Sequence, residues 1–279
     1  MDAHHHLWDP DRRAYPWLSP EELAPIRRRY DVEQLRELAT SSGVEGTVLV
    51  QTVGDLDETR EFLAVAADSA GFVRGVVGWA ELTAPDLASQ LDDLRAGRGG
   101  NRLVGIRHQA QDEPDPAWLS RADVIRGLRT VAAAGLAYDI LVLPHQLFAA
   151  IDATTLVPEG RFVLDHAAKP PIRSGALEPW ASQIRALAAQ PHVFCKLSGL
   201  VTEADWRRWR PADLRPYAET VLDAFGPQRV MAGSDWPVCE LAADYTQVWE
   251  TTKILLSGLT RAEESDVLAG TATSAYHLP

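Results

Sequence analysis

The sequence predicts an α/β fold, a single (β/α)8 barrel of the TIM type that spans residues 1–279 as one domain. The length of 279 residues is close to the roughly 250 that such a barrel needs. Eight short β-branched runs alternate with amphipathic stretches, which is typical of right-handed βαβ units. Glycines follow several helical runs, at Gly43, Gly71, Gly135 and Gly226. A doubly wound sheet is the alternative, but no glycine-rich phosphate loop follows the first strand.

The predicted elements follow from two periodicities. Short apolar runs predict strands over Asp2–His6, Gly46–Thr52, Phe72–Ala80, Leu103–Gln109, Ala137–Leu143, Arg161–Asp165, Val193–Leu197 and Arg229–Gly233. Apolar residues at helical spacing, such as Leu35, Leu38 and Ala39, predict helices over Val32–Ser41, Asp57–Ser69, Pro85–Ala96, Ile125–Ala134, Pro144–Asp152, Pro179–Ala189 and Pro216–Phe225. A further helical segment is expected at Leu268–Ala272.

The composition argues against several partners. The formal net charge is -12, and the basic cluster Arg27–Arg29 lies beside two glutamates, so we expect no nucleic-acid partner. No apolar leader precedes Asp2 and no run reaches about 18 apolar residues, so we expect neither export nor a membrane partner. The two cysteines, Cys195 and Cys239, predict free, inert thiols in a cytoplasmic protein. The oligomeric state is not predicted.

The most informative residues lie at the two ends of the chain. Side chains two apart in a strand point the same way, so His4 and His6 can share one site while His5 faces elsewhere. Asp235 follows the last predicted strand. In a closed parallel barrel the C-terminal ends of the first and last strands meet, which places this carboxylate beside the imidazoles. Two other interpretations are a tag remnant for the histidines and a helix N-cap for the aspartate.

Polar residues also follow the other predicted strands. Strand 3 ends near Trp79, strand 4 at Arg107, His108 and Gln109, strand 6 at Asp165 and His166 with Lys169 nearby, and strand 7 carries Lys196. We expect these residues to surround one pocket, with Arg107, His108, Gln109, Lys169, Trp79 and Trp236 as substrate-binding candidates. His108 is better interpreted as a pocket-wall or core residue than as a catalyst. Lys196 can instead pair with a buried carboxylate, Asp139 or Asp165.

Four segments together carry a resemblance to a known family. Asp2–Pro10, Leu164–His166 with Lys169-Pro170, Cys195–Leu200 and Gly233–Pro237 resemble the amidohydrolase superfamily, specifically its lactonase clade. That clade includes L-fuconolactonases, L-rhamnonolactonases and 2-pyrone-4,6-dicarboxylate lactonases. The resemblance runs nearly end to end and implies a distorted barrel of the amidohydrolase type.

The resemblance implies four catalytic residues, His4, His6, His166 and Asp235. Many superfamily members bridge two metals with a carboxylated lysine at the end of strand 4 or 5, where this sequence has none. We therefore expect no two-metal centre. One divalent ion such as zinc can bind to His4, His6 and Asp235, but we do not expect the reaction to require a cofactor.

The sequence thus predicts a hydrolase that opens the lactone of a sugar acid, such as L-fucono- or L-rhamnonolactone. Asp235 would activate water while the histidines support the developing oxyanion. The alternatives are a metal-dependent decarboxylase or amidohydrolase on the same barrel, and a catalytically silent barrel that only binds. A serine hydrolase built on Ser234 lacks the Gly-x-Ser-x-Gly pattern. Loops at about 9–30 and 201–215 are long and rich in tryptophan, and we expect them to act as lids.

Overall fold

A computed structural model describes residues 1–278. Eight parallel strands form one sheet in the order β1 to β8, so each strand lies beside its neighbour in the sequence. The strands are β1 (Asp2–His5), β2 (Thr47–Val50), β3 (Val73–Gly78), β4 (Leu103–His108), β5 (Ala137–Ile140), β6 (Arg161–Leu164), β7 (Val193–Leu197) and β8 (Val230–Ala232). The predicted (β/α)8 barrel is confirmed, and each observed strand falls within its predicted range.

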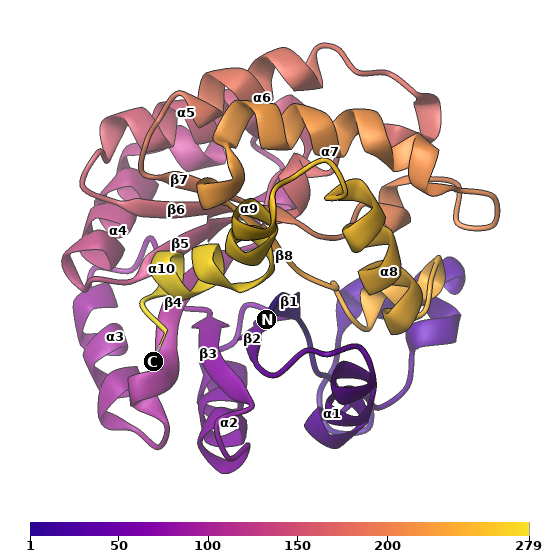
Figure 1. Ribbon diagram of the computed structural model, residues 1–279. Coiled ribbons are helices and arrows are strands. Elements are labelled where there is room, and N and C mark those ends of the chain that lie inside the picture. The colour runs from indigo at the N-terminus through magenta and orange to yellow at the C-terminus, as the bar shows by residue number, and fades with distance from the viewer. Residues whose placement is uncertain (279) are drawn as a thin grey trace.

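Helices surround the strands on the outside of the barrel (Figure 1). They are α1 (Val32–Ser41), α2 (Leu56–Asp68), α3 (Leu87–Ala96), α4 (Ala122–Ala133), α5 (Leu147–Leu156), α6 (Trp180–Ala188), α7 (Pro211–Phe225), α8 (Tyr245–Leu255), α9 (Arg261–Ser265) and α10 (Thr271–Tyr276). The sequence did not predict α8 or α9, and it started α7 five residues late. Pro211 occupies the first helical turn, where a missing N–H costs nothing, and Pro216 is accommodated inside the helix.

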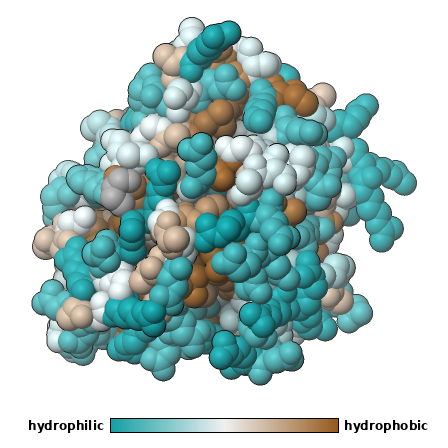
Figure 2. All heavy atoms as spheres, turned by 60° about the horizontal axis from the view of Figure 1, so that its bottom comes forward, coloured by the Kyte–Doolittle hydropathy of each residue, from teal (hydrophilic) through white to brown (hydrophobic). Residues whose placement is uncertain are grey.

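The barrel interior is packed with small apolar side chains. Ala3, Val50, Val77, Val163 and Met231 belong to one buried cluster there, which α10 closes with side chains that include Tyr276. The much larger second cluster packs the helices against the outer face of the sheet. Hydrophilic residues cover most of the face shown in Figure 2. Within residues 1–278, no helix has the length and apolar character needed to cross a membrane.

The barrel closes between β8 and β1 through a few specific bonds. The contact consists of an isolated parallel bridge between His5 and Trp236 and of backbone bonds from His6 N to Trp236 O (2.7 Å) and from Asp235 N to His4 O (2.8 Å). These bonds lie just beyond the C-terminal end of β8. They place the segment that carries Asp235 directly beside the two predicted histidines.

Candidate active site

A cavity of about 320 Å³ opens at the C-terminal ends of the strands. Its inner wall contains residues that follow strands β1, β4, β6 and β8, and its outer wall comes from the connecting loops. The lining residues are His6, Trp17, Leu23, Thr52, Arg107, Gln109, Gln111, Asp112, Leu141, His166, Lys169, Thr202, Glu203, Trp206, Asp235, Val238 and Leu241. The cavity is large enough for a small organic substrate.

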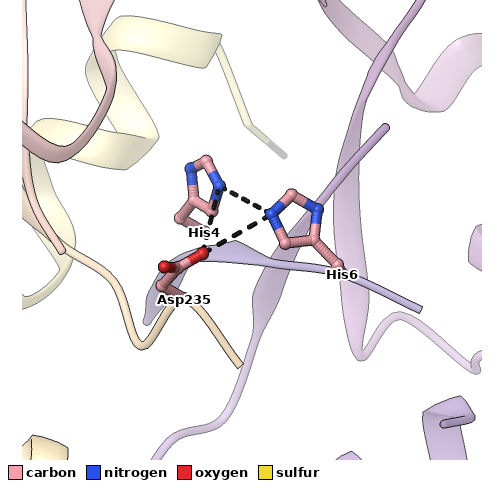
Figure 3. Close-up of side chains that lie close together, drawn as sticks. All are labelled: His4, His6 and Asp235. Carbon is pink, nitrogen blue, oxygen red and sulfur yellow. Dashed lines mark hydrogen bonds and ion pairs between the residues drawn. The ribbon is translucent and has the colours of Figure 1, made fainter. Parts of the chain in front are cut away.

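Three imidazoles surround one carboxylate oxygen at the inner wall of the cavity. Asp235 Oδ1 lies 3.5 Å from His6 Nε2, 3.9 Å from His4 Nε2 and 3.8 Å from His166 Nε2. The His4 and His6 Nε2 atoms are 3.1 Å apart, and Figure 3 shows both rings turned toward Asp235. His5 points elsewhere and contacts Thr47 Oγ1. We call His4, His6, His166 and Asp235 the histidine–aspartate cluster.

The buried carboxylate of Asp2 holds the backbone next to this cluster. Its Oδ1 accepts hydrogen bonds from Ser234 N (2.9 Å) and His4 N (3.1 Å), and its Oδ2 from Ser234 Oγ (2.6 Å) and Tyr245 OH (3.1 Å). Asp2 therefore joins β1, the segment after β8 and helix α8. Asp235 itself adopts a left-handed backbone conformation, with φ of 57°. The sequence reasoning missed this role, although Asp2 stands two residues before the first histidine of the pair.

A left-handed turn presents two further polar side chains to the cavity. His166, Ala167, Ala168 and Lys169 all have φ between 49° and 57°, which costs about 1–2 kcal/mol per residue for side chains other than glycine. Trp180 Nε1 donates to Ala167 O (2.8 Å) and anchors the turn. The turn directs both His166 and Lys169 into the cavity. Strain of this kind is typical of functional sites.

Burial and nearby charges set the protonation of the cluster. Burial alone would raise the pKa of Asp235, but His166, His6 and Lys169 together lower it below its usual range. Burial lowers the pKa of His166 to about 4, and it lowers the pKa of His4 well below its ordinary value. Near neutral pH, an ionised Asp235 carboxylate therefore faces the neutral imidazoles of His4 and His166. This arrangement can accept a proton from water.

A buried ionic network lies directly behind the cluster. Lys196 Nζ contacts Asp139 Oδ2 (2.5 Å), Asp165 Oδ1 (3.0 Å) and His4 Nδ1 (3.1 Å). Arg107 Nη1 bonds to Asp165 Oδ2 (2.9 Å), and Tyr276 OH bonds to Asp139 (2.8 Å). Lys196 thus pairs with both carboxylates between which the sequence left the choice open. It is fully buried and is not among the residues that line the cavity.

The cluster also offers a suitable set of ligands for one metal ion. One ligand atom each from His4, His6 and Asp235 lies within 4.8 Å of the others, and two imidazole nitrogens with a carboxylate oxygen suit zinc. His6 Nδ1 contacts Val50 O (2.8 Å), which leaves its Nε2 facing the cluster. His4, Asp165 and His166 form a second group of candidate ligands. The residues therefore fit a divalent ion.

Three predicted substrate-binding residues line the cavity and three lie elsewhere. Arg107, Gln109 and Lys169 are among the described lining residues, whereas His108, Trp79 and Trp236 are not. His108 Nε2 pairs with Glu113 (2.7 Å), and its Nδ1 accepts a hydrogen bond from Trp79 Nε1 (3.2 Å). The His108 ring stacks on the indole of Trp118, with ring centroids 4.3 Å apart.

Trp236 is buried, packs against Tyr30 and donates from Nε1 to Glu240 (2.9 Å). Position at a strand end does not by itself give the direction of a side chain, because successive side chains alternate between the two faces of the sheet. The placement of Trp79, His108 and Trp236 at the cavity wall is therefore corrected.

The two loops expected to act as lids provide several residues that the sequence analysis did not single out. Trp17 and Leu23 come from the loop after β1, and Thr202, Glu203 and Trp206 come from the loop after β7. Burial raises the pKa of Glu203. The only sequence signal for these positions was the tryptophan content of the two loops.

Comparisons with known proteins agree with this geometry. A family model described as amidohydrolase matches residues 1–278. The chain is 42% identical over 296 residues to an L-fucono-1,5-lactonase of Burkholderia multivorans, covering 100% of this chain and 96% of the relative. It is 39% identical to an L-fucono-1,5-lactonase of Burkholderia ambifaria, covering 88% of this chain and 82% of the relative. A crystal structure of an amidohydrolase from Burkholderia multivorans with bound zinc has a TM-score of 0.92 at 41% identity, covering 100% of this chain and 99% of that one.

Proposed function

The chain belongs to the amidohydrolase family, and we propose that it is a lactonase, a hydrolase that opens the ring of a sugar-acid lactone. The observation that carries this proposal is the Asp235 carboxylate, which faces the imidazoles of His4, His6 and His166 within a cavity large enough for a small substrate. The two L-fucono-1,5-lactonases similar to this chain support the choice of a lactone over the other substrates of such barrels.

Asp235 acts as general base and then as general acid. Its carboxylate takes a proton from water while the water oxygen bonds to the lactone carbonyl carbon and the carbonyl π electrons move to oxygen. The tetrahedral adduct then re-forms the carbonyl, the bond from the carbonyl carbon to the ring oxygen breaks, and Asp235 returns the proton to the departing oxygen. The product is the open-chain hydroxy acid. The departing ring oxygen becomes an alcohol, and the protonated carboxyl group of Asp235 is a strong enough acid to protonate it.

Positive groups at the same wall stabilise the negative charge that develops on the carbonyl oxygen. The Arg107 guanidinium is 3% exposed, and Nη1 and Nη2 are held by Asp165 and by Gln51, so it is pre-oriented before substrate binds. Lys169 faces the cavity from the left-handed turn. Fixed donors in a buried site stabilise such a charge without reorganising during the reaction.

The cavity wall favours a neutral, hydroxyl-rich substrate with one apolar side. Amide and hydroxyl groups of Thr52, Gln109 and Gln111 can hydrogen-bond ring hydroxyls, while Trp17 and Leu23 contribute apolar surface. Arg107 is the one arginine among the described lining residues, and a dianionic pyrone lactone would need more. We therefore propose L-fucono-1,5-lactone as the first substrate to test, with L-rhamnonolactone as the second.

We propose that the reaction does not require a metal ion. If a divalent ion binds, His4, His6 and Asp235 would hold it, and it would supply Lewis-acid stabilisation of the oxyanion. The residues described above supply a base, donors and a shaped cavity of their own.

The decisive experiment measures acid release with a pH indicator across a panel of aldonolactones. The protein is assayed after chelator treatment and again after zinc is added. Turnover that survives chelation supports the proposal, whereas turnover only with zinc would make His4, His6 and Asp235 obligatory ligands. Absence of hydrolysis in both states would favour the alternative, a decarboxylase or amide hydrolase on the same barrel.

Asp235→Asn tests the assigned base directly. We expect kcat to fall by about 10²–10⁴-fold, because the amide cannot take the proton, while the urea midpoint of unfolding stays close to that of the wild type. A near-normal kcat would remove Asp235 from this role.

We further propose that residues 1–279 work as one catalytic unit in the cytoplasm, with the lactone as the only partner the reaction needs. The cavity lining comes from loops of the first and last strands alike, and both cysteines are free and buried, as suits a reducing compartment. The acidic net charge of -12 argues against a nucleic-acid partner. Cell fractionation with an antibody tests the location.

A further inference from the structure

Glu203 is a half-buried residue whose carboxylate faces the cavity without a partner in the protein. It lines the cavity from the loop after β7. Within residues 1–278, neither of its carboxylate oxygens accepts a hydrogen bond or forms an ion pair; burial raises its pKa, and the nearby charge of Lys169 opposes that rise. Neither oxygen is among the enclosed polar atoms that lack a partner, so both remain open to the cavity.

The segment around Glu203 is fixed, which holds the carboxylate in this position. Val201 and Ala204 on either side of it are buried. Trp206 Nε1 donates to Thr202 O (2.8 Å), so the indole that lines the cavity beside Glu203 has no free N–H group. The loop thus presents one charged acceptor next to one apolar aromatic surface. Such a pair suits a sugar ring, which has both hydroxyl groups and an apolar C–H face.

Other buried carboxylates at this end of the barrel have donors within the protein. Asp165 Oδ2 accepts from Arg107 Nη1 (2.9 Å), and Glu58 accepts from the backbone N–H of Thr52 (2.8 Å). A partly buried carboxylate without donors has lost hydration, and that cost is recovered only when a ligand supplies donors. Glu203 is therefore suited to a ligand that brings hydrogen-bond donors into the cavity.

The charges along the cavity wall restrict which ligands can bring those donors. The described lining residues include three carboxylates, Asp112, Glu203 and Asp235, and two cations, Arg107 and Lys169. Arg107 is already paired with a carboxylate behind the wall. The remaining excess of negative charge repels an anion, whereas a sugar hydroxyl donates to a carboxylate as an uncharged group.

We propose that Glu203 is a specificity-determining residue: its carboxylate accepts hydrogen bonds from the ring hydroxyls of an uncharged lactone and repels ligands that carry a carboxylate of their own. The inference rests on the proposed function in taking a lactone as the substrate. The same repulsion acts on the product, because the open-chain hydroxy acid is an anion at neutral pH. Glu203 therefore favours both the entry of the lactone and the release of the acid.

Glu203→Gln tests the proposal by turnover. The amide keeps the shape of the side chain, removes its charge and breaks no hydrogen bond within the protein. The assay is run at about pH 8, far above the ordinary pKa of a glutamate, with L-fucono-1,5-lactone and with δ-valerolactone, a lactone that has no hydroxyl groups. We expect kcat/KM to fall at least about tenfold for the first and to change less than about twofold for the second. Equal losses on the two substrates would overturn the proposal, since they would indicate general damage to the site.

Binding of two ligands that do not react tests the same role without turnover. 1,5-Anhydro-L-fucitol has an uncharged ring with hydroxyl groups and no carbonyl, and L-fuconate is the anion of the hydroxy acid. We expect Glu203→Gln to bind the uncharged ring at least about fivefold more weakly and the anion at least about fivefold more tightly, as calorimetry would measure. A wild-type protein that binds the uncharged ring no better than the anion would overturn the proposal, and so would affinities that do not change in the variant. If the protein hydrolyses no lactone, the proposed function fails while these affinities still decide the role of Glu203.

Glu37→Gln is the matched control. It makes the same chemical change on helix α1, where the side chain is exposed and is not among the described residues that line the cavity. Solvent and salt screen a charge at such a position, so kcat/KM and both affinities should stay within about twofold of the wild type. A response like that of Glu203→Gln would show that the net charge of the protein makes the selection, and would overturn the assignment to Glu203.

Discussion

The carboxylate of Asp2 makes a sharp prediction about how the barrel seam supports the active site. Asp2→Ala removes an acceptor that now receives four hydrogen bonds, two from the backbone N–H groups of Ser234 and His4 and two from the hydroxyls of Ser234 and Tyr245. All of these groups are buried. The seam between β8 and β1 has few other bonds, so this loss falls where the two halves of the active site meet.

The magnitude follows from what each donor can do afterwards. The two backbone N–H groups cannot turn to another partner, and an unsatisfied buried donor costs about 1–3 kcal/mol, so the pair costs about 2–6 kcal/mol. The hydroxyls can rotate, and the Ser234 hydroxyl already has His4 O at 3.4 Å as a second acceptor. Asp2→Asn keeps a carbonyl oxygen for the N–H groups and offers an amide to the hydroxyl oxygens. Its cost should stay below about 1.5 kcal/mol.

Urea unfolding followed by tryptophan fluorescence measures both variants, and kcat measures the active site. We expect the alanine variant to lose stability as calculated and also to lose turnover, because Ser234 precedes Asp235, the proposed general base. The asparagine variant should keep most of both. An alanine variant within about 0.5 kcal/mol of the wild type would refute the reasoning. Equal damage in the two variants would show that the charge, and not the hydrogen bonds, is what matters.

Three further predictions concern other parts of the barrel. Gly199→Ala should lower kcat about ten- to hundredfold, because Gly199 has φ of 65° and an added Cβ would lie 2.7 Å from Nδ1 of His166. Gly175→Ala is the control: it has φ of 70°, and no described atom lies within 4 Å of its added Cβ. Burial raises the pKa of Cys195 and Cys239, so neither thiol should react with Ellman's reagent until the protein unfolds; rapid labelling of native protein would contradict this. Burial also raises the pKa of Glu58, so the protonated carboxyl group stabilises the fold at low pH, and this stabilisation is lost as the pH rises through the raised pKa. The free energy of unfolding of Glu58→Gln should therefore increase relative to that of the wild type between pH 4 and pH 8. Urea unfolding at the two pH values measures this difference.

The sequence was sufficient to predict the barrel and the central group of the site, for a simple topological reason. Once eight parallel strands close on themselves, the first and last strands must be neighbours. His4 and His6 therefore meet Asp235, although more than 200 positions separate them in the sequence. The family resemblance added His166, whose ring the strand pattern alone places only near the rim.

Side-chain direction at the rim lay beyond the sequence. Arg107 and His108 are adjacent at the end of β4, yet one lines the cavity and the other pairs with Glu113 on the outside. The left-handed turn that begins at His166 contains no glycine or asparagine to announce it. Tertiary contacts, such as the bond from Trp180 to the backbone of the turn, impose a conformation that local preference opposes.

The sequence left open whether Lys196 pairs with Asp139 or with Asp165, and in the structure it pairs with both. Strand positions place Asp139, Asp165 and Lys196 on neighbouring strands, and pairing of the lysine with either carboxylate is equally consistent with that. An ammonium has three donors, so it can contact both carboxylates and still donate to His4. The third contact joins the ionic network to the histidine–aspartate cluster. Removal of Lys196 alone would leave one more buried carboxylate than cation, at a cost of about 3–5 kcal/mol, so the charge balance of the network is kept only when a carboxylate is removed with it.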